Sequence, residues 1–410
     1  MSELGVRLRQ IWRQLEPIGR TSVAGGYRRF AWNDADLACR EWFQREATSL
    51  DLAVETDRNG NLWAWWDVEG ERTGAVVTGS HLDSVPEGGA FDGPLGVAGG
   101  LLAVDLLRKR GARPLRPLAV ACFADEEGSR FGVACAGSRL LTGALDAGRA
   151  HELYDRDGIS MAAAMGAAGV SAGELGRDQE LLDAIGVFVE LHVEQGRGLV
   201  DEGAPVGVAT AVWPHGRWRI DLVGEPNHAG TTRLSDRHDP VLPLAVAALE
   251  ARRAATEAGG VATVGRVEVE PNAVNAVAAS AHVWVDVRAP HGAQVASIVA
   301  AVTEATRRAG AEHGVEVTVT AESQSRGVGF PAELQTRLVT TLERCGLSAP
   351  RLPTGAGHDA AILGAELPAA MLFVRNPTGI SHSPAEFAAE ADCVAGVEAL
   401  SAVLEELACR

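Results

Sequence analysis

The sequence predicts an α/β fold in which a larger domain is interrupted by a smaller α+β domain. Apolar runs typical of buried strands alternate with helical segments up to residue 210 and again after residue 325. This alternation is typical of an open, largely parallel sheet covered by helices on both faces. Between these parts the order becomes strand, helix, strand, strand, helix, strand, which is the split arrangement of a ferredoxin-like layer. We therefore expect the larger domain to comprise residues 1–210 and 325–410, and the smaller one residues 211–324.

Four apolar runs predict the strands of the larger domain, at residues 75–81, 117–123, 185–193 and 369–374. A helix is expected over residues 93–110, because apolar residues recur there at helical spacing and basic residues occupy the last turn. Gly111 follows where a helix commonly ends on glycine. The Ala/Gly-rich stretch from Met161 to Gly176 predicts a surface helix with loops.

The inserted segment predicts strands at 216–224, 262–270, 281–288 and 315–322, and helices at 240–258 and 292–313. Its third strand alternates in character. Valines at 283, 285 and 287 fall on one face, and His282, Trp284, Asp286 and Arg288 fall on the other. One face of this sheet should therefore pack on helices, while the other stays available to a partner or ligand.

Composition narrows the class of protein. The 410 residues are 46% hydrophobic and 22% charged, which is ordinary globular usage. The formal charge, 37 − 54 = −17, argues against a binder of nucleic acid or of an anionic membrane. We see no signal peptide and no apolar run long enough to span a membrane. Six scattered cysteines without a CxxC pair are typical of reduced thiols, so we expect a cytoplasmic protein.

Metal-binding residue types follow or end three of the predicted strands. They are His81, Asp83 and Asp92; Asp125, Glu126 and Glu127; and Glu190, His192 and Glu194. Because functional groups of open α/β sheets gather at the carboxyl ends of strands, these clusters are expected to converge. Imidazole and carboxylate without thiolate suit Zn²⁺, Mn²⁺, Co²⁺ or Ni²⁺, and the sequence does not choose among them.

Such a ligand set is suited to hydrolysis. A carboxylate that bridges two ions gives a site where a shared water is acidified and a substrate carbonyl is polarised. An unligated carboxylate beside it then takes the proton of that water, and the adjacent Glu126 and Glu127 could divide the two roles. Taken singly, a histidine after a strand is more often a satisfied core group, and paired acids are usually a solvated turn.

Two short motifs match patterns of other protein classes, a serine hydrolase and a dinucleotide-binding protein, and we discount both. Residues 169–173 match the nucleophile-elbow pattern GxSxG but stand in the Ala/Gly-rich stretch rather than between a strand and a helix. Residues 355–360 fit the dinucleotide fingerprint GxGxxA, but no strand is expected before them, and His358 and Asp359 crowd the turn where phosphate would lie.

At these residues the chain resembles the hydantoinase/carbamoylase branch of the M20 metallo-amidohydrolase family. That branch includes N-carbamoyl-L-amino acid hydrolases, allantoate amidohydrolases and one type of β-ureidopropionase. The resemblance runs in order through motifs at residues 79–85, 88–96, 126–132, 190–196, 228–232, 271–275, 355–360 and 379–384. It therefore spans nearly the whole chain.

The resemblance implies a site with two divalent metal ions per subunit, Zn²⁺ or Mn²⁺, with Co²⁺ or Ni²⁺ possible. The implied ligands are His81, Asp92, Glu127, His192 and His382, with Asp92 bridging, His81 and His192 completing one ion, and Glu127 and His382 the other. Glu126 is the implied general base. The implied substrate-binding residues are Gln195, His228, Asn275, Arg288, Gly357 and His358.

The resemblance also implies a homodimer whose small domain acts as a lid, with His228 and Asn275 supplied by the partner subunit. Arg288 would bind the substrate carboxylate, and a cis peptide would follow Asp92. The chain departs from the family at Ala278-Ala279, where Pro-Gly is usual, and at Arg233-Leu234, where Pro-Met is common. Both departures fall where substrate choice is decided.

The implied reaction is hydrolysis of a C–N bond in a ureido or amide group next to a carboxylate. An N-carbamoyl-L-amino acid would give the amino acid, ammonia and CO₂. Allantoate is the second candidate substrate. An N-acyl amino acid hydrolase and a non-catalytic binding protein of the same fold remain further alternatives.

Overall fold

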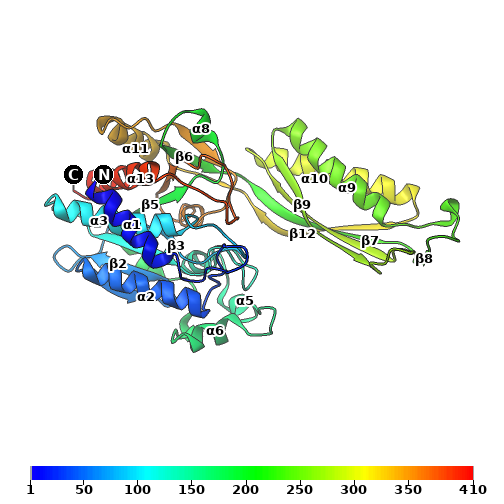
Figure 1. The fold of residues 1–410 in the computed structure, drawn as a ribbon, viewed down its shortest axis with the longest axis horizontal. Helices are drawn as coiled ribbons and strands as arrows, with labels where there is room; N and C mark the ends of the chain where they lie inside the picture. Colours follow the sequence, from blue (N-terminus) through cyan, green and yellow to red (C-terminus); the bar gives the residue numbers. More distant parts are fainter. Residues whose placement is uncertain (1, 410) are drawn as a thin grey trace. The chain divides into compact units, whose positions relative to one another are not determined.

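The computed structural model describes residues 2–409 and divides into two compact units. Unit 1 consists of residues 1–211 and 329–410, and unit 2 of residues 212–328. Both are drawn in Figure 1. Among the described residues, no helix combines the length and the apolar character needed to cross a membrane.

Unit 1 is built on a nine-stranded sheet with a parallel centre and antiparallel edges. The path through it runs β1-β2-β4-β3-β5-β15-β6-β13, with β14 paired to β6. The strands are β1 (Ala53–Thr56), β2 (Leu62–Trp66), β3 (Ala75–His81), β4 (Leu118–Phe123), β5 (Ile185–Val193), β6 (Val206–Val212), β13 (Val328–Gly329), β14 (Arg351–Thr354) and β15 (Ala369–Val374). The central strands β4, β3, β5 and β15 are mutually parallel.

The four apolar runs that predict strands are those four central strands, with bounds that differ by at most one residue. Their residues are buried almost throughout, as expected of strands covered on both faces. The expectation of a largely parallel sheet is wrong at the edges, where β2 and β6 pair antiparallel to their neighbours. The expectation of no strand before residue 355 is also wrong, because β14 is there.

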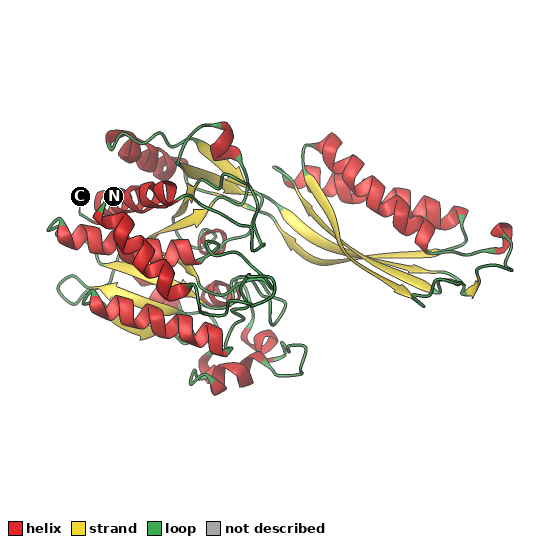
Figure 2. Cartoon of the chain, viewed as in Figure 1, coloured by secondary structure: helices red, strands yellow, loops and turns green. Residues whose placement is uncertain are grey.

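Helices cover both faces of this sheet (Figure 2). One face carries α1 (Glu3–Leu15), α2 (Asp34–Ser49), α3 (Pro94–Lys109), α11 (Ala332–Arg344) and α13 (Glu390–Ala408), which share one core with the sheet. The other carries α4 (Ala136–Thr142), α7 (Gln179–Ala184) and α12 (Asp359–Leu363). Short helices complete the unit: α5 (Ala147–His151), α6 (Met161–Ala167), η1 (Ala172–Glu174) and α8 (Gly198–Asp201).

The order of the central strands fixes where a site can form. The chain passes from β3 through α3 to β4 on one side, and later returns as β5 on the other side of β3. Loops leaving the carboxyl ends of β3 and its neighbours therefore diverge, and this edge is the usual ligand position in open α/β sheets.

Unit 2 is a four-stranded antiparallel sheet in the order β12-β7-β11-β9 with two helices packed on one face. Its strands are β7 (His215–Val223), β9 (Val261–Glu270), β11 (Ser280–Arg288) and β12 (Glu316–Ser325), and its helices are α9 (Val241–Ala258) and α10 (Gly292–Glu312). The pair β8 (Asn227–His228) and β10 (Ala276–Val277), with η2 (Leu234–Asp236), completes it. This is the predicted ferredoxin-like order. Along β11 the three valines are buried under the helices, as the alternation predicts.

Unit 2 depends on this one-sided core, which gives a stability prediction. Ile220 on β7 is 1% exposed against α9 and α10, so Ile220→Ala should lower the free energy of unfolding by about 2–5 kcal/mol. Thr320 on β12 is exposed, so Thr320→Ala should change it by less than about 0.5 kcal/mol. Urea unfolding followed by circular dichroism measures both. Equal losses in the two variants would contradict the one-sided core.

Candidate metal centre

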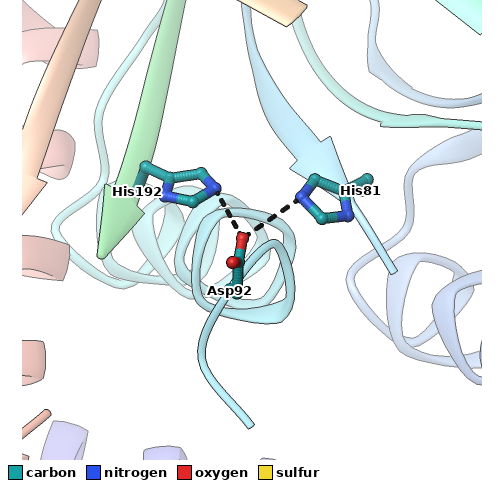
Figure 3. A group of neighbouring side chains, drawn as sticks. All are labelled: His81, Asp92 and His192. Atoms are coloured by element: carbon teal, nitrogen blue, oxygen red, sulfur yellow. Dashed lines mark ion pairs between the residues drawn. The ribbon is translucent and has the colours of Figure 1, made fainter. Parts of the chain in front are cut away.

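Three side chains from separate segments meet at the carboxyl edge of the central strands. His81 is the last residue of β3, His192 lies near the end of β5, and Asp92 is in the loop before α3. Both imidazoles point at the Asp92 carboxylate (Figure 3), with Nε2 of His192 and of His81 at 3.3 and 3.6 Å from its Oδ1. All three side chains are buried.

Each imidazole is fixed through its other nitrogen. Nδ1 of His81 lies 3.1 Å from the carbonyl oxygen of Asp83, and Nδ1 of His192 lies 2.9 Å from that of Val193. A carbonyl only accepts, so Nδ1 carries a proton, and Nε2 is the nitrogen directed at Asp92. This is the orientation that metal-ligating histidines usually have.

The nitrogen His192 Nε2 is buried and makes no hydrogen bond of regular geometry among the described residues, although Asp92 Oδ1 lies 3.3 Å away. An unpaired buried polar atom is costly and calls for an explanation. A divalent cation between the two imidazoles and Asp92 would supply the missing partner, and imidazole with carboxylate is a ligand set that suits such ions. The residues present therefore fit a metal ion.

A second group of potential ligands shares the same aspartate. Nε2 of His382, which lies in the loop between β15 and α13, is 3.3 Å from Asp92 Oδ2 and 3.7 Å from Glu127 Oε2. Asp92 thus turns one carboxylate oxygen to the two strand-borne histidines and the other toward His382. The structure brings together all five of the residues that the resemblance names as ligands.

The turn that carries Asp92 requires a glycine. Gly93 has φ +84°, and a Cβ there would lie 2.5 Å from the ring of His81. Glycine accepts this backbone conformation without the steric penalty of a side chain. The expected cis peptide after Asp92 is wrong, because among residues 2–409 the one cis bond joins Glu270 to Pro271.

Glu126 lies beside this group and is held from several directions. Its Oε2 is 3.7 Å from His81 Nε2, and its Oε1 accepts a hydrogen bond from the buried Cys135 thiol at 3.2 Å. Asp83 orients the backbone, because its two oxygens accept the N–H groups of Glu126 and Glu127 at 3.1 and 3.0 Å. Adjacent glutamates are thereby separated, with Glu127 toward His382 and Glu126 toward His81.

The charges around Asp92 are unbalanced without a cation. Burial, with the nearby Asp92, raises the pKa of Glu127 to about 7, and burial also raises the pKa of Glu126 well above its usual range. The hydrogen bond to Asp92 raises the pKa of His382 to about 9. Protons are therefore retained where negative charge is crowded, and a divalent ion would replace them.

A further set, Glu190, His192 and His358, is close enough to hold an ion but is otherwise engaged. The oxygens of Glu190 accept from Ser80 Oγ at 2.8 Å and from the Ala360 N–H at 2.9 Å. Glu194 does not converge on this site as the sequence predicts. Its carboxylate instead accepts the N–H groups of residues 198 and 199 at the start of α8. Both glutamates hold backbone in place.

Three of the residues expected to bind substrate lie in unit 1. Gln195 Nε2 donates to Asp92 Oδ2 at 2.7 Å and lies 3.4 Å from His382 Nε2. His358 is buried with its ring centroid 4.4 Å from that of His192, and burial lowers its pKa well below the usual value, so its imidazole is neutral. Gly357 precedes it and is exposed.

His228 and Asn275 lie together in unit 2 on the β8–β10 pair. Ala276 pairs with His228, and the Asn275 carbonyl accepts the Ala229 N–H at 3.0 Å. Nδ1 of His228 accepts the N–H groups of residues 230 and 231, so the ring proton is on Nε2. This exposed imidazole therefore presents a hydrogen-bond donor.

Arg288 is at the other end of unit 2, at the last residue of β11. Its Nε and Nη2 donate to the two oxygens of Asp286 at 2.7 and 3.2 Å. Burial alone would raise the pKa of Asp286. The guanidinium groups of Arg288 and Arg217 outweigh this effect, so the pKa of Asp286 is lower than usual. The guanidinium is held on the polar face of the sheet, as the alternation of β11 predicts.

Two buried residues at the centre escaped sequence reasoning. Cys135 bonds to Glu126, and Glu386 accepts the backbone N–H groups of Phe91 and Asp92. Neither belongs to a local pattern with a chemical meaning. Only the folded chain brings them to the site.

The chain is similar to known proteins over nearly its whole length. Residues 77–406 match the family described as Peptidase family M20/M25/M40. The chain is 32% identical over 405 residues to an N-carbamoyl-L-amino acid amidohydrolase of Geobacillus stearothermophilus, covering 97% of this chain and 98% of that protein. It is 32% identical over 389 residues to an allantoate amidohydrolase of Escherichia coli (strain K12), covering 94% of each.

A solved structure is similar throughout. The amidase of the hydantoinase/carbamoylase family from Burkholderia vietnamiensis matches with a TM-score of 0.88 and 31% identity, covering 99% of this chain and 98% of that one. The family match alone spans residues 77–406, so the chain belongs to peptidase family M20, and its relatives place it among the hydrolases that act on C–N bonds outside peptides.

Proposed function

We propose that the protein is a binuclear-metal amidohydrolase that converts an N-carbamoyl-L-amino acid and water to the amino acid, ammonia and CO₂. The observation that carries the proposal is the shared Asp92 carboxylate, whose oxygens face His81 and His192 on one side and His382 on the other. A carboxylate placed between two ligand groups is what a two-ion site requires. The curated relatives act on ureido compounds by their names, which supports the ureido substrate.

The chain's own groups divide the work. Two bound divalent ions would acidify a water molecule and polarise the ureido carbonyl. Glu126, which is not among the proposed ligands, takes the proton of that water and delivers it to the leaving nitrogen. The Nε2–H of His228 and the Asn275 side chain hold the carbonyl oxygen, and Arg288 binds the carboxylate as a bidentate partner.

The positions of the substrate residues within unit 2 favour a homodimer. His228 and Asn275 are near the Ser280 end of β11, while Arg288 ends that nine-residue strand. At about 3.3 Å per residue the two sets are roughly 25–30 Å apart, much longer than one carbamoyl amino acid. We therefore propose that His228 and Asn275 of one subunit serve the site of the other.

Allantoate is the second candidate substrate, because it also carries a ureido nitrogen beside a carboxylate. An N-carbamoyl-L-amino acid amidohydrolase and an allantoate amidohydrolase are each 32% identical to the chain. The departures at residues 233–234 and 278–279 adjoin the loops of His228 and Asn275, where the two substrates would be distinguished.

Ammonia release tests the activity directly. Metal-depleted protein reconstituted with Zn²⁺ or Mn²⁺ should release ammonia from a panel of N-carbamoyl-L-amino acids, and EDTA should abolish that release. Allantoate is assayed in parallel, with an N-acetyl amino acid as the amide control. Turnover of allantoate alone would select the second candidate. If metal-bound protein released no ammonia from either ureido substrate, the proposal would be excluded.

Adjacent glutamates provide a matched pair for the mechanism. Glu126→Gln should retain both ions but lose about 10²–10⁴-fold in kcat, because the proton acceptor is gone while the shape is kept. Glu127→Gln should instead lose metal, since an amide is a poor substitute for a ligating carboxylate. Metal content by elemental analysis and kcat are measured on both. Substantial turnover by Glu126→Gln would contradict its assignment as the base.

Arg288→Ala should raise KM about 10- to 100-fold while leaving kcat within a few-fold, because it removes a charged hydrogen-bonding partner of the substrate carboxylate. Arg288→Lys should not restore KM, since an ammonium lacks the bidentate geometry. Arg266→Ala is the control, because Arg266 is exposed on the same sheet and pairs with Glu268. An unchanged KM in Arg288→Ala would show that the carboxylate is bound elsewhere.

A further inference from the structure

Glu386 connects two segments that carry proposed metal ligands. It lies four residues after His382, in the loop between β15 and α13, and it is 5% exposed. Its Oε1 accepts the backbone N–H groups of Phe91 and Asp92 at 2.8 and 2.9 Å. One carboxylate oxygen thus fixes the main chain at the residue that both ligand groups share.

Ser381, in the same loop as Glu386, contacts both Glu386 and Asp92. Its Oγ is 3.3 Å from Asp92 Oδ2 and 3.4 Å from Glu386 Oε2. Asp92 is therefore held by backbone contacts to Glu386 and by a side-chain contact to Ser381, and both come from the segment that bears His382. Residues almost 300 apart in the sequence are locked into one local geometry.

The loop on the other side is shaped to receive this carboxylate. Gly89 lies so close to Glu386 that a Cβ there would be 2.3 Å from Oε1 and 2.5 Å from the Glu386 Cβ. The second distance involves the base of the side chain, which cannot swing away as its tip can. An alanine at 89 would therefore displace Glu386 without removing its charge.

The two ligand groups do not depend equally on this contact. His81 and His192 are carried by β3 and β5 in the centre of the sheet, and their Nδ1 atoms are fixed to carbonyl groups. His382 lies in a loop, its side chain is 51% exposed, and its distance to Asp92 is set by the contacts of that loop. Loss of the Glu386 contact should thus disturb the group of Asp92, Glu127 and His382 more than the group of His81, Asp92 and His192.

We propose that Glu386 is a positioning residue that sets the affinity for the metal ion held by Asp92, Glu127 and His382. The inference rests on the proposed function only in requiring two ions at this centre. Metal sites need ligands held to within about 0.5 Å, and loss of a group that orients a ligand typically costs 10- to 100-fold in metal affinity. Glu386 touches neither substrate nor ion in this assignment.

The test measures Zn²⁺ affinity on metal-depleted full-length protein by competition with a chromophoric chelator. Glu386→Ala should bind one ion within about threefold of wild type and the second ion 10- to 100-fold more weakly. Glu386→Gln retains a carbonyl oxygen that accepts both N–H groups and should bind both ions nearly as wild type does. Gly89→Ala should reproduce the alanine variant. Glu390→Ala is the control, because Glu390 pairs with Arg9 on the surface.

The outcomes separate the inference from the proposed function. Wild-type affinity for both ions in Glu386→Ala would overturn the inference, as would equal weakening of both ions together with a lowered Tm of the metal-free protein. A wild-type protein that binds two ions but hydrolyses no ureido substrate overturns the proposed activity alone. Selective loss of the second ion with rescue in Glu386→Gln would then still support the role of Glu386.

Discussion

The arrangement of the site depends on one carboxylate, that of Asp92, held between histidines from three separate segments. Its Oδ1 faces the imidazoles of β3 and β5, and its Oδ2 faces the loop after β15. Because β3, β5 and β15 are parallel, their carboxyl ends lie at one edge, and a single loop residue can reach all three. The topology of the sheet therefore determines the chemistry that this edge can support.

Burying several carboxylates at one edge of the sheet is unfavourable, and hydrogen bonds, most of them from backbone N–H groups, offset part of that free energy. Asp83 accepts two N–H groups, Glu190 accepts Ser80 and an N–H group, and Glu386 accepts two more N–H groups. These acids orient the loops, while the carboxylates of Asp92, Glu126 and Glu127 face the histidines of the site. A buried carboxylate is tolerated when it is hydrogen-bonded or paired with a cation. The same residue type thus has two separable uses here, as a scaffold and as a candidate ligand or base.

Local patterns predicted the parts of this protein that local physics determines. Continuous apolar runs identified the central strands, and alternation at residues 281–288 identified the buried face of β11. The antiparallel edges were missed. Strands β1 and β14 are short and carry no apolar run, and the apolar run of β2 does not indicate the direction in which that strand pairs. Glu386 and Cys135 were missed for another reason. Their roles arise from contacts between distant segments, and no spacing in the sequence encodes them.

The division of the candidate residues between two units has a physical consequence for specificity. The ligand and base residues are set on strands and loops of unit 1, and His81, Asp92, Glu126 and His192 are buried there. Three of the groups proposed to recognise substrate, His228, Asn275 and Arg288, are on unit 2, at the β8–β10 pair and at the end of β11. On the proposed assignments, Arg233-Leu234 and Ala278-Ala279 would alter that recognition surface without touching a candidate ligand. The choice of substrate would then vary without a change in the groups proposed to cleave the bond, because the two sets lie in different parts of the chain.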